Sequence, residues 1–166
     1  MGKIFAGLIF LFFDFPLAGI NVMPNFVGYI LTYLGMNEMR FASLTYAQTQ
    51  KLAAGAAVYD GILWIISLPW AGFSGAAAVL LSIASGVLQL AIAFYIWMGV
   101  RELEQTPGAP DMGSKNMRIC WWGLLICWVV SLLPIPLSQL AVILTIAAAL
   151  GYLLFYYHAW QLYRAS

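Results

Sequence analysis

The sequence predicts an all-α integral membrane protein with six membrane helices, arranged as three helical hairpins in a single domain over residues 1–166. Of these residues, 64% are hydrophobic and only 8% are charged, whereas soluble domains are roughly 45 to 50% apolar. Long apolar stretches alternate with short segments that contain proline or glycine, a pattern typical of membrane helices joined by turns. All seven basic residues fall at one end of these hairpins, as expected for one face of a membrane.

The first hairpin is interrupted by the stretch DFPLAGINVMPN at residues 14–25. A single helix over residues 4–39 would be about 54 Å long, and the hydrocarbon core is only about 30 Å thick. Pro16 and Pro24 each lack a backbone donor, and Asn25 can cap a following helix. We therefore expect a hairpin that is short or broken, with both ends on the same side.

Two structures of its first segment agree with these observations. Residues 4–13 alone make about 15 Å of helix, which is half the hydrocarbon thickness and fits a re-entrant loop. If the helix instead kinks at Pro16 and continues to Ile20, it crosses the bilayer. The sequence favours the kinked spanning helix.

The rest of the chain supplies four more segments and two more turns. The segment at 119–133 is the shortest, and it spans only if residues 116–118 and the prolines at 134 and 136 lie in the interfaces. The four predicted segments are 52–70, 75–100, 119–133 and 137–163, with turns at 69–75 and 134–138. The three hairpins therefore cover about 4–39, 52–100 and 119–163, and the connections between them cover about 40–51 and 101–118.

The basic residues orient these hairpins. Lysine and arginine concentrate on the cytoplasmic side of membrane proteins. We therefore expect both termini and both connections to be cytoplasmic. The basic residues are Lys3, Arg40, Lys51, Arg101, Lys115, Arg118 and Arg164.

Three short motifs suggest an internal repeat. They are YLGMNEM at 33–39, WMGVREL at 97–103 and YHAWQLY at 157–163, and each lies at the inner end of a hairpin. A parallel repeat would relate the hairpins by a pseudo-threefold axis along the membrane normal. The alternative is that every helix leaving a membrane shows an aromatic belt followed by charges.

Asp60 is the most informative position for function. It lies nine residues after Lys51, and hence roughly 12 Å into the predicted helix. A carboxylate at that depth costs on the order of 3 kcal/mol unless it is paired, hydrated or protonated. His158, six residues before Arg164, has a similar predicted depth and is the natural partner. Such a pair predicts a proton relay or a site for a cation or polar solute, and a structural hydrogen bond is the alternative.

Four other polar residues are candidates for ligand binding. Asp14, Asn21 and Asn25 lie at the helix break, where transporters place substrate sites, although a simple outer turn needs the same residues. Gln89 lies near the middle of a long span. Helix packing is the favoured interpretation of Gln89, and a polar lumen is the alternative.

Several classes of protein are disfavoured. The chain has no HExxH motif, no phosphate-binding glycine loop, and no serine or cysteine with a histidine base at recognisable spacing. With a single histidine and two cysteines seven residues apart, no metal site is indicated. A net charge of +1 and the lack of a Lys/Arg run argue against nucleic-acid binding and a polybasic lipid patch. We expect no catalysis, and the sequence identifies no cofactor.

The N-terminal quarter resembles small bacterial inner-membrane proteins of uncharacterised function. The resemblance rests on GLIFLFFDF at 7–15, followed by G-x-N-x-x-P-x-F-x-G-Y-I-L at 19–31. It implies a multi-pass protein of the bacterial inner membrane and no particular activity.

The sequence leaves two functions open. The leading hypothesis is a protein that binds or conducts a small solute or ion near Asp60 and His158, as part of a larger transporter or alone. The alternative is an accessory protein that binds another membrane protein, or a second copy of itself, through faces of small residues. In both cases the lipid bilayer is a partner.

Overall fold

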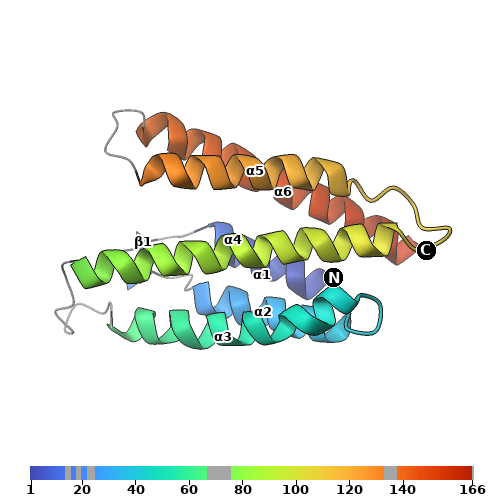
Figure 1. The fold of residues 1–166 in the computed structure, drawn as a ribbon, viewed down its shortest axis with the longest axis horizontal. Coiled ribbons are helices and arrows are strands. Elements are labelled where there is room, and N and C mark those ends of the chain that lie inside the picture. The colour runs from blue at the N-terminus through green and yellow to red at the C-terminus, as the bar shows by residue number, and fades with distance from the viewer. Residues whose placement is uncertain (14–15, 18–19, 22–24, 67–75, 133–137, 166) are drawn as a thin grey trace.

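The computed structural model describes residues 1–13, 16–17, 20–21, 25–66, 76–132 and 138–165. Within these residues the chain forms six helices and one pair of two-residue strands (Figure 1). The helices are α1 (Gly2–Phe12), α2 (Asn25–Glu38), α3 (Leu44–Ile66), α4 (Ala76–Glu104), α5 (Ser114–Ser131) and α6 (Ser138–Ala165). The strands are β1 (Pro16–Leu17) and β2 (Ile20–Asn21).

The helices pack in chain order around an elongated bundle. Each helix contacts the next one along the chain, and α6 contacts α1, so the ring of neighbours is closed. Figure 1 shows both termini at one end of the bundle, together with the connections after α2 and after α4. The prediction of an all-helical fold is therefore confirmed for the described residues apart from this short strand pair, and both termini lie at the same end of the bundle.

The first hairpin is short, as predicted, but its helix does not continue through Pro16. Helix α1 ends at Phe12, and Phe13 is extended with φ −112° and ψ 102°. Strands β1 and β2 then pair antiparallel, with Pro16 opposite Asn21. The predicted kinked helix reaching Ile20 is therefore wrong. Proline lacks the backbone donor that a helix needs, and it disfavours helical geometry in the residue before it.

Carboxylates near the end of α4 cap both neighbouring helices, so that helical structure extends into the two connections expected between the hairpins. Glu102 accepts hydrogen bonds from the backbone N–H groups of Leu44 and Thr45, both at 2.9 Å. Helix α3 therefore begins at Leu44, so that most of the connection expected at 40–51 is helical. Such capping satisfies N–H groups that have no partner inside the helix.

Glu104 does the same for α5. Its carboxylate accepts hydrogen bonds from the backbone N–H groups of Met112 at 2.7 Å and Gly113 at 3.0 Å. Helix α5 follows directly at Ser114. Helix α4 runs on to Glu104 and α5 begins at Ser114, so that only the middle part of the connection expected at 101–118 is not helical.

The core contains four tyrosines with no exposed surface: Tyr29, Tyr46, Tyr152 and Tyr156. Three of them donate to backbone carbonyls: Tyr46 to Ile96 at 3.1 Å, Tyr152 to Ala93 at 2.5 Å and Tyr156 to Met1 at 3.4 Å. Buried hydroxyls normally require such partners. Tyr29 differs, since its hydroxyl has no hydrogen-bond partner in the described part of the chain.

Two helices are long and apolar enough to cross a membrane, over Val79–Glu104 in α4 and Val142–Ala165 in α6. Helices α1 and α2 are shorter, with 11 and 14 residues. Helix α3 begins with the polar stretch LTYAQTQK, and α5 begins with SKNMR. In the described part of the chain, length and composition thus support two spans rather than the six predicted from the sequence.

Candidate functional site

Asp60 is buried on the face of α3 that packs against the rest of the bundle. The buried positions of α3 are Tyr46, Thr49, Ala53, Ala56 and Asp60, spaced three or four residues apart. This spacing places them on one side of a helix. Only 6% of the surface of Asp60 is exposed, although a carboxylate is strongly hydrated in water. The groups that contact the carboxylate of Asp60 therefore determine whether its charge is compensated.

Helix α4 supplies one of these partners. Ser85 donates its hydroxyl to Oδ2 of Asp60 at 3.0 Å. The adjacent residue Tyr59 donates its hydroxyl to the carbonyl of Leu81, one turn earlier on α4, at 2.9 Å. These two hydrogen bonds fix the rotation of α3 relative to α4, and they hold the carboxylate of Asp60 against Ser85.

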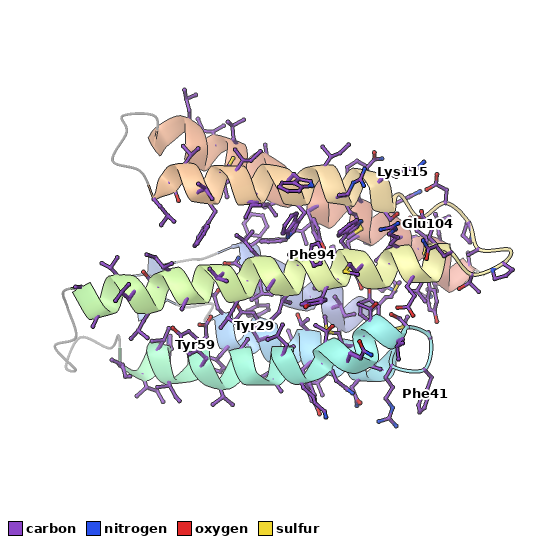
Figure 2. All side chains as sticks on the ribbon, viewed as in Figure 1. Tyr29, Phe41, Tyr59, Phe94, Glu104 and Lys115 are labelled. Atoms are coloured by element: carbon purple, nitrogen blue, oxygen red, sulfur yellow. The ribbon has the colours of Figure 1, made fainter. Side chains whose placement is uncertain are left out.

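Helix α2 covers the other side of this part of α3. The ring of Phe26 packs against that of Trp64 with centroids 5.9 Å apart, and it also lies beside Gly61. Tyr29, one turn further along α2, is close enough to Asp60 for the two groups to interact electrostatically. Figure 2 shows Tyr29 and Tyr59 in the half of the bundle away from the termini. Asp60 therefore lies where α2, α3 and α4 meet.

Two oxygen atoms where α2, α3 and α4 meet have no hydrogen-bond partner among the described residues. They are Oδ1 of Asp60 and the hydroxyl of Tyr29. Oδ1 of Asn25, one turn before Tyr29 on α2, is also unpaired among these residues. Leaving a buried acceptor unpaired costs roughly 1 to 3 kcal/mol, and more for a charged group. Such a group in a native structure therefore calls for a ligand, a proton or a water. Carboxylate, hydroxyl and amide oxygens are the ligands that hard cations prefer, and a carboxylate can also take up a proton.

His158 is not the partner of Asp60. It is exposed on α6 and interacts electrostatically with Asp111, in the connection between α4 and α5. The pKa of Asp111 is lowered, chiefly by the hydrogen bond from the backbone N–H of Gly113, and His158 adds a smaller effect.

The predicted pairing of Asp60 with His158 is wrong because the sequence placed the two residues at a similar depth. Helix α3 begins at Leu44, so Asp60 lies about 24 Å along its axis and near its outer end. His158 lies only about 10 Å from the inner end of α6 at Ala165. The two side chains are therefore in opposite halves of the bundle.

The candidates at the helix break are only partly described. Asp14 lies outside the described residues. The backbone of Asn21 belongs to β2, where it pairs with Pro16. Asn25 is the first residue of α2, and its Oδ1 caps no backbone N–H in the described part of the chain, contrary to the expectation from the sequence. Asn25 lies one turn before Tyr29 on the same face of α2.

Gln89 joins two helices. Its side-chain amide donates to the carbonyl of Leu11, in the last turn of α1, where carbonyls lack partners inside the helix. Beside it lies a cavity of about 100 Å³, bounded by Phe12, Leu124 and Trp128 among others. This volume is enough for a few water molecules. The contact with α1 agrees with the packing interpretation of Gln89.

Neither Tyr29 nor Ser85 was predicted from the sequence as a residue of this site. Tyr29 lies four residues after Asn25, so the two residues share a face of α2. That spacing could have identified Tyr29 as a neighbour of Asn25 from the sequence alone. No spacing within the sequence shows that Ser85 faces Asp60, because their contact depends on how α3 and α4 pack.

Comparisons with known proteins give no family or relative. No family model matches the chain, and neither curated proteins nor solved structures show a significant similarity to it.

Proposed function

We propose that this chain is a multi-pass protein of the bacterial inner membrane with both termini in the cytoplasm. Two features of the helix surfaces support an apolar surrounding. The apolar windows of α4 and α6 are only 17% and 28% buried inside the bundle, unlike the core helix of a soluble protein. Large hydrophobic side chains are exposed on several helices, including Ile65 at 59%, Leu80 at 67%, Ile126 at 58% and Leu154 at 68%. Such surfaces require lipid or another protein to cover them.

The full six-segment arrangement is part of this proposal. Helix α3, with 23 residues, and α5, with 18, are long enough if their polar first turns lie at the cytoplasmic interface. The hairpin of α1 and α2 is short, and it enters only part of the bilayer. The three hairpins would then be related by the pseudo-threefold repeat suggested by their inner ends.

Within this bundle, we propose that the protein binds or conducts a small cation, Na⁺ or a proton, at Asp60. The observation that carries the proposal is the buried Asp60 carboxylate, with one oxygen held by Ser85 and the other without a partner in the part of the chain that the structure describes. An ionised carboxylate inside a membrane protein is stable only when it is compensated, and such residues mark ion pathways. The hydroxyls of Ser85 and Tyr29 add neutral oxygen ligands without adding charge.

The charge at the site favours a monovalent ion. Asp60 is the only carboxylate that the described residues bring to this region, and they contain no group of three acidic, histidine or cysteine side chains suited to a metal. Divalent ions usually take several carboxylates. One carboxylate with neutral oxygens balances a single positive charge, which is what Na⁺ or a proton carries.

The test is ion flux into proteoliposomes. Purified wild-type protein should admit Na⁺ or protons, detected by a trapped dye for each ion, and Asp60→Asn should abolish that flux. Asp111→Asn is the matched control, because it removes the same charge from an exposed connection outside the bundle. Equal flux through wild type and Asp60→Asn would refute a role for Asp60.

The competing function is an accessory protein that covers its exposed apolar faces with another membrane protein. The exposed residues on α3, α5 and α6 are the observation in its favour. In that case a second polypeptide would remain bound after gentle extraction, and Asp60→Asn would alter neither ion flux nor partner binding. Native mass spectrometry of the extracted protein distinguishes the two functions.

A further inference from the structure

A basic pocket lies at the inner end of the bundle, between the end of α4 and the beginning of α5. It has a volume of about 290 Å³ and is lined by Arg101, Lys115 and Arg118, with Trp97 and Glu104 among its other residues. Figure 2 shows Lys115 and Glu104 at the end of the bundle where the termini lie. The three basic residues are spread over 18 positions of the sequence, and only the fold brings them together.

The lining of this pocket carries an excess of positive charge. The one salt bridge in the described part of the chain joins Lys3 to Glu38, on other helices. Glu104 is the one acidic residue that lines the pocket, against three basic ones, and its carboxylate is turned to the N–H groups of Met112 and Gly113. Lys115 also interacts electrostatically with Asp111, and the pocket keeps a net positive field toward an anion.

An apolar groove lies between the same two helices. It has a volume of about 360 Å³ and is lined by Val87, Phe94, Trp121, Leu125 and Trp128, with other apolar residues. Figure 2 shows Phe94 beside α4, on the side toward α5. Val87 is 50% exposed, so this groove reaches the surface of the bundle.

The groove and the basic pocket are joined by aromatic side chains. The ring of Phe94 in the groove contacts Trp97 in the pocket at 5.2 Å and Trp121 at 5.1 Å, between centroids. Trp97 is only 7% exposed, and its Nε1–H donor has no partner among the described residues. A polar donor thus lies unused at the boundary between the charged and the apolar parts.

The spacing along both helices makes this a continuous stripe. On α4, Val87, Ala91, Phe94 and Arg101 follow one another at three, four or seven residues, which keeps them on one face. One face of α5 likewise carries residues three or four positions apart, namely Arg118, Trp121, Leu125 and Trp128. From Arg101 to Val87 the stripe is about 21 Å long, which covers one leaflet of a hydrocarbon core about 30 Å thick.

We propose that this stripe binds one anionic phospholipid, with its phosphate between Arg101, Lys115 and Arg118 and an acyl chain in the groove. The cationic end matches the headgroup in charge, and the apolar remainder matches the chain in length. Basic pockets between membrane helices on the cytoplasmic side bind anionic headgroups in this way. The inference rests on the proposed membrane location, but not on the cation site at Asp60.

The test is native mass spectrometry of the purified protein in detergent, titrated with dioleoylphosphatidylglycerol or dioleoylphosphatidylcholine. Wild type should bind one phosphatidylglycerol in preference to phosphatidylcholine. The double variant Arg101→Gln/Arg118→Gln should lose that affinity by about tenfold or more. The control Lys51→Gln/Arg164→Gln removes two charges elsewhere at the same end, and it should bind like wild type. Equal losses in both double variants, or no preference between the lipids, would overturn the proposal.

A second pair of variants tests the groove. Ala91→Trp fills the groove, and it should weaken binding of dioleoylphosphatidylglycerol, while Ala147→Trp on the exposed face of α6 should not. Circular dichroism should show the same helix content in both. Equal binding by the two variants would place the acyl chain elsewhere and contradict the proposal.

Two further measurements separate the possible outcomes. Inorganic phosphate at millimolar concentration should not displace the lipid, and displacement would assign the pocket to a soluble anion and overturn the lipid proposal. Asp60→Asn should bind phosphatidylglycerol like wild type, so that failure of the cation site and failure of the lipid site are distinguishable.

Discussion

Ser85 on α4 donates a hydrogen bond of 3.0 Å to Oδ2 of Asp60 on α3, while Oδ1 of the same carboxylate has no partner in the described part of the chain. One oxygen of the carboxylate is thus held in place by the protein, and the other is buried without a partner in these residues. A buried acid of this kind needs a cation, a proton or a water to compensate it. The proposed cation site depends on this relationship between Ser85 and Asp60.

Replacement of Asp60 with Asn should raise stability in buffer free of Na⁺ and K⁺ at neutral pH. The amide removes a buried charge and keeps the shape, so we expect a gain on the order of 1 kcal/mol in the free energy of unfolding. Thermal unfolding in detergent with choline as the only salt cation measures this. A loss of stability would indicate that the charge is compensated by the protein itself.

Replacement of Ser85 with Ala should destabilise the protein, because it removes the hydrogen bond to the carboxylate. Hydrogen bonds to charged groups contribute about 1.5 to 3 kcal/mol, and we expect a loss in that range. Ser82→Ala is the control, since Ser82 donates only to the carbonyl of Val79 in its own helix. If both variants unfold at the same temperature, the contact between Ser85 and Asp60 contributes nothing.

The first hairpin depends on close contact between α1 and α2 at Gly7. A Cβ atom at Gly7 would lie 2.4 Å from Oγ1 of Thr32 and 2.6 Å from the carbonyl oxygen of Gly28. Gly7→Ala should therefore separate the helices and cost about 1 to 3 kcal/mol. Gly55→Ala, on α3 with nothing within 4 Å, should be neutral or slightly stabilising. Denaturant unfolding measures the stability of both variants. Equal stability of the two would contradict the close packing of α1 against α2 at Gly7.

Helix α3 should shorten when its cap is removed. Glu102→Ala leaves the N–H groups of Leu44 and Thr45 without acceptors, and loss of a capping residue costs about 0.5 to 2 kcal/mol. Gln105→Ala, exposed in the next turn, should change stability by less than about 0.5 kcal/mol. Hydrogen exchange at residues 44–50 should increase in Glu102→Ala only. Unchanged exchange would show that this cap is dispensable.

The contribution of Asp111 should depend on pH in the acid range. Its pKa is lowered in the folded protein, first by the hydrogen bond from the N–H of Gly113. A lowered pKa means that the ionised form stabilises the fold above the unfolded value near ~3.9, and that this is lost as pH falls through the folded value. Wild type should therefore be more stable than Asp111→Asn at pH 6, and the difference should vanish in strong acid. A difference independent of pH would contradict this.

The sequence was a good guide to the helices and a poor guide to their ends. Apolar stretches and prolines predicted six helices and an interruption within residues 14–25, because both effects act locally along the chain. The favoured helix through Pro16 to Ile20 was wrong. The beginning of α3 could not be predicted, since it depends on Glu102, which is 58 residues from Leu44. The depth of Asp60 was wrong for the same reason, and so was its predicted pairing with His158.

For the candidate sites too, single residues could be recognised in the sequence, but their neighbours in the fold could not. Asp60 was singled out because a carboxylate within an apolar stretch is visible in the sequence, and the structure buries it. Ser85 and Tyr29 come from two other helices, and only tertiary packing brings them near it. The basic pocket was missed because Arg101, Lys115 and Arg118 form no run in the sequence and meet only across the connection between α4 and α5.

The most direct test of the central claim is calorimetric titration of the purified protein, with NaCl and with acid. Wild type should bind one Na⁺, or take up one proton, at a site that Asp60→Asn lacks and Asp111→Asn keeps. If wild type and Asp60→Asn bind Na⁺ and protons identically, Asp60 is a structural residue and the proposed cation site does not exist.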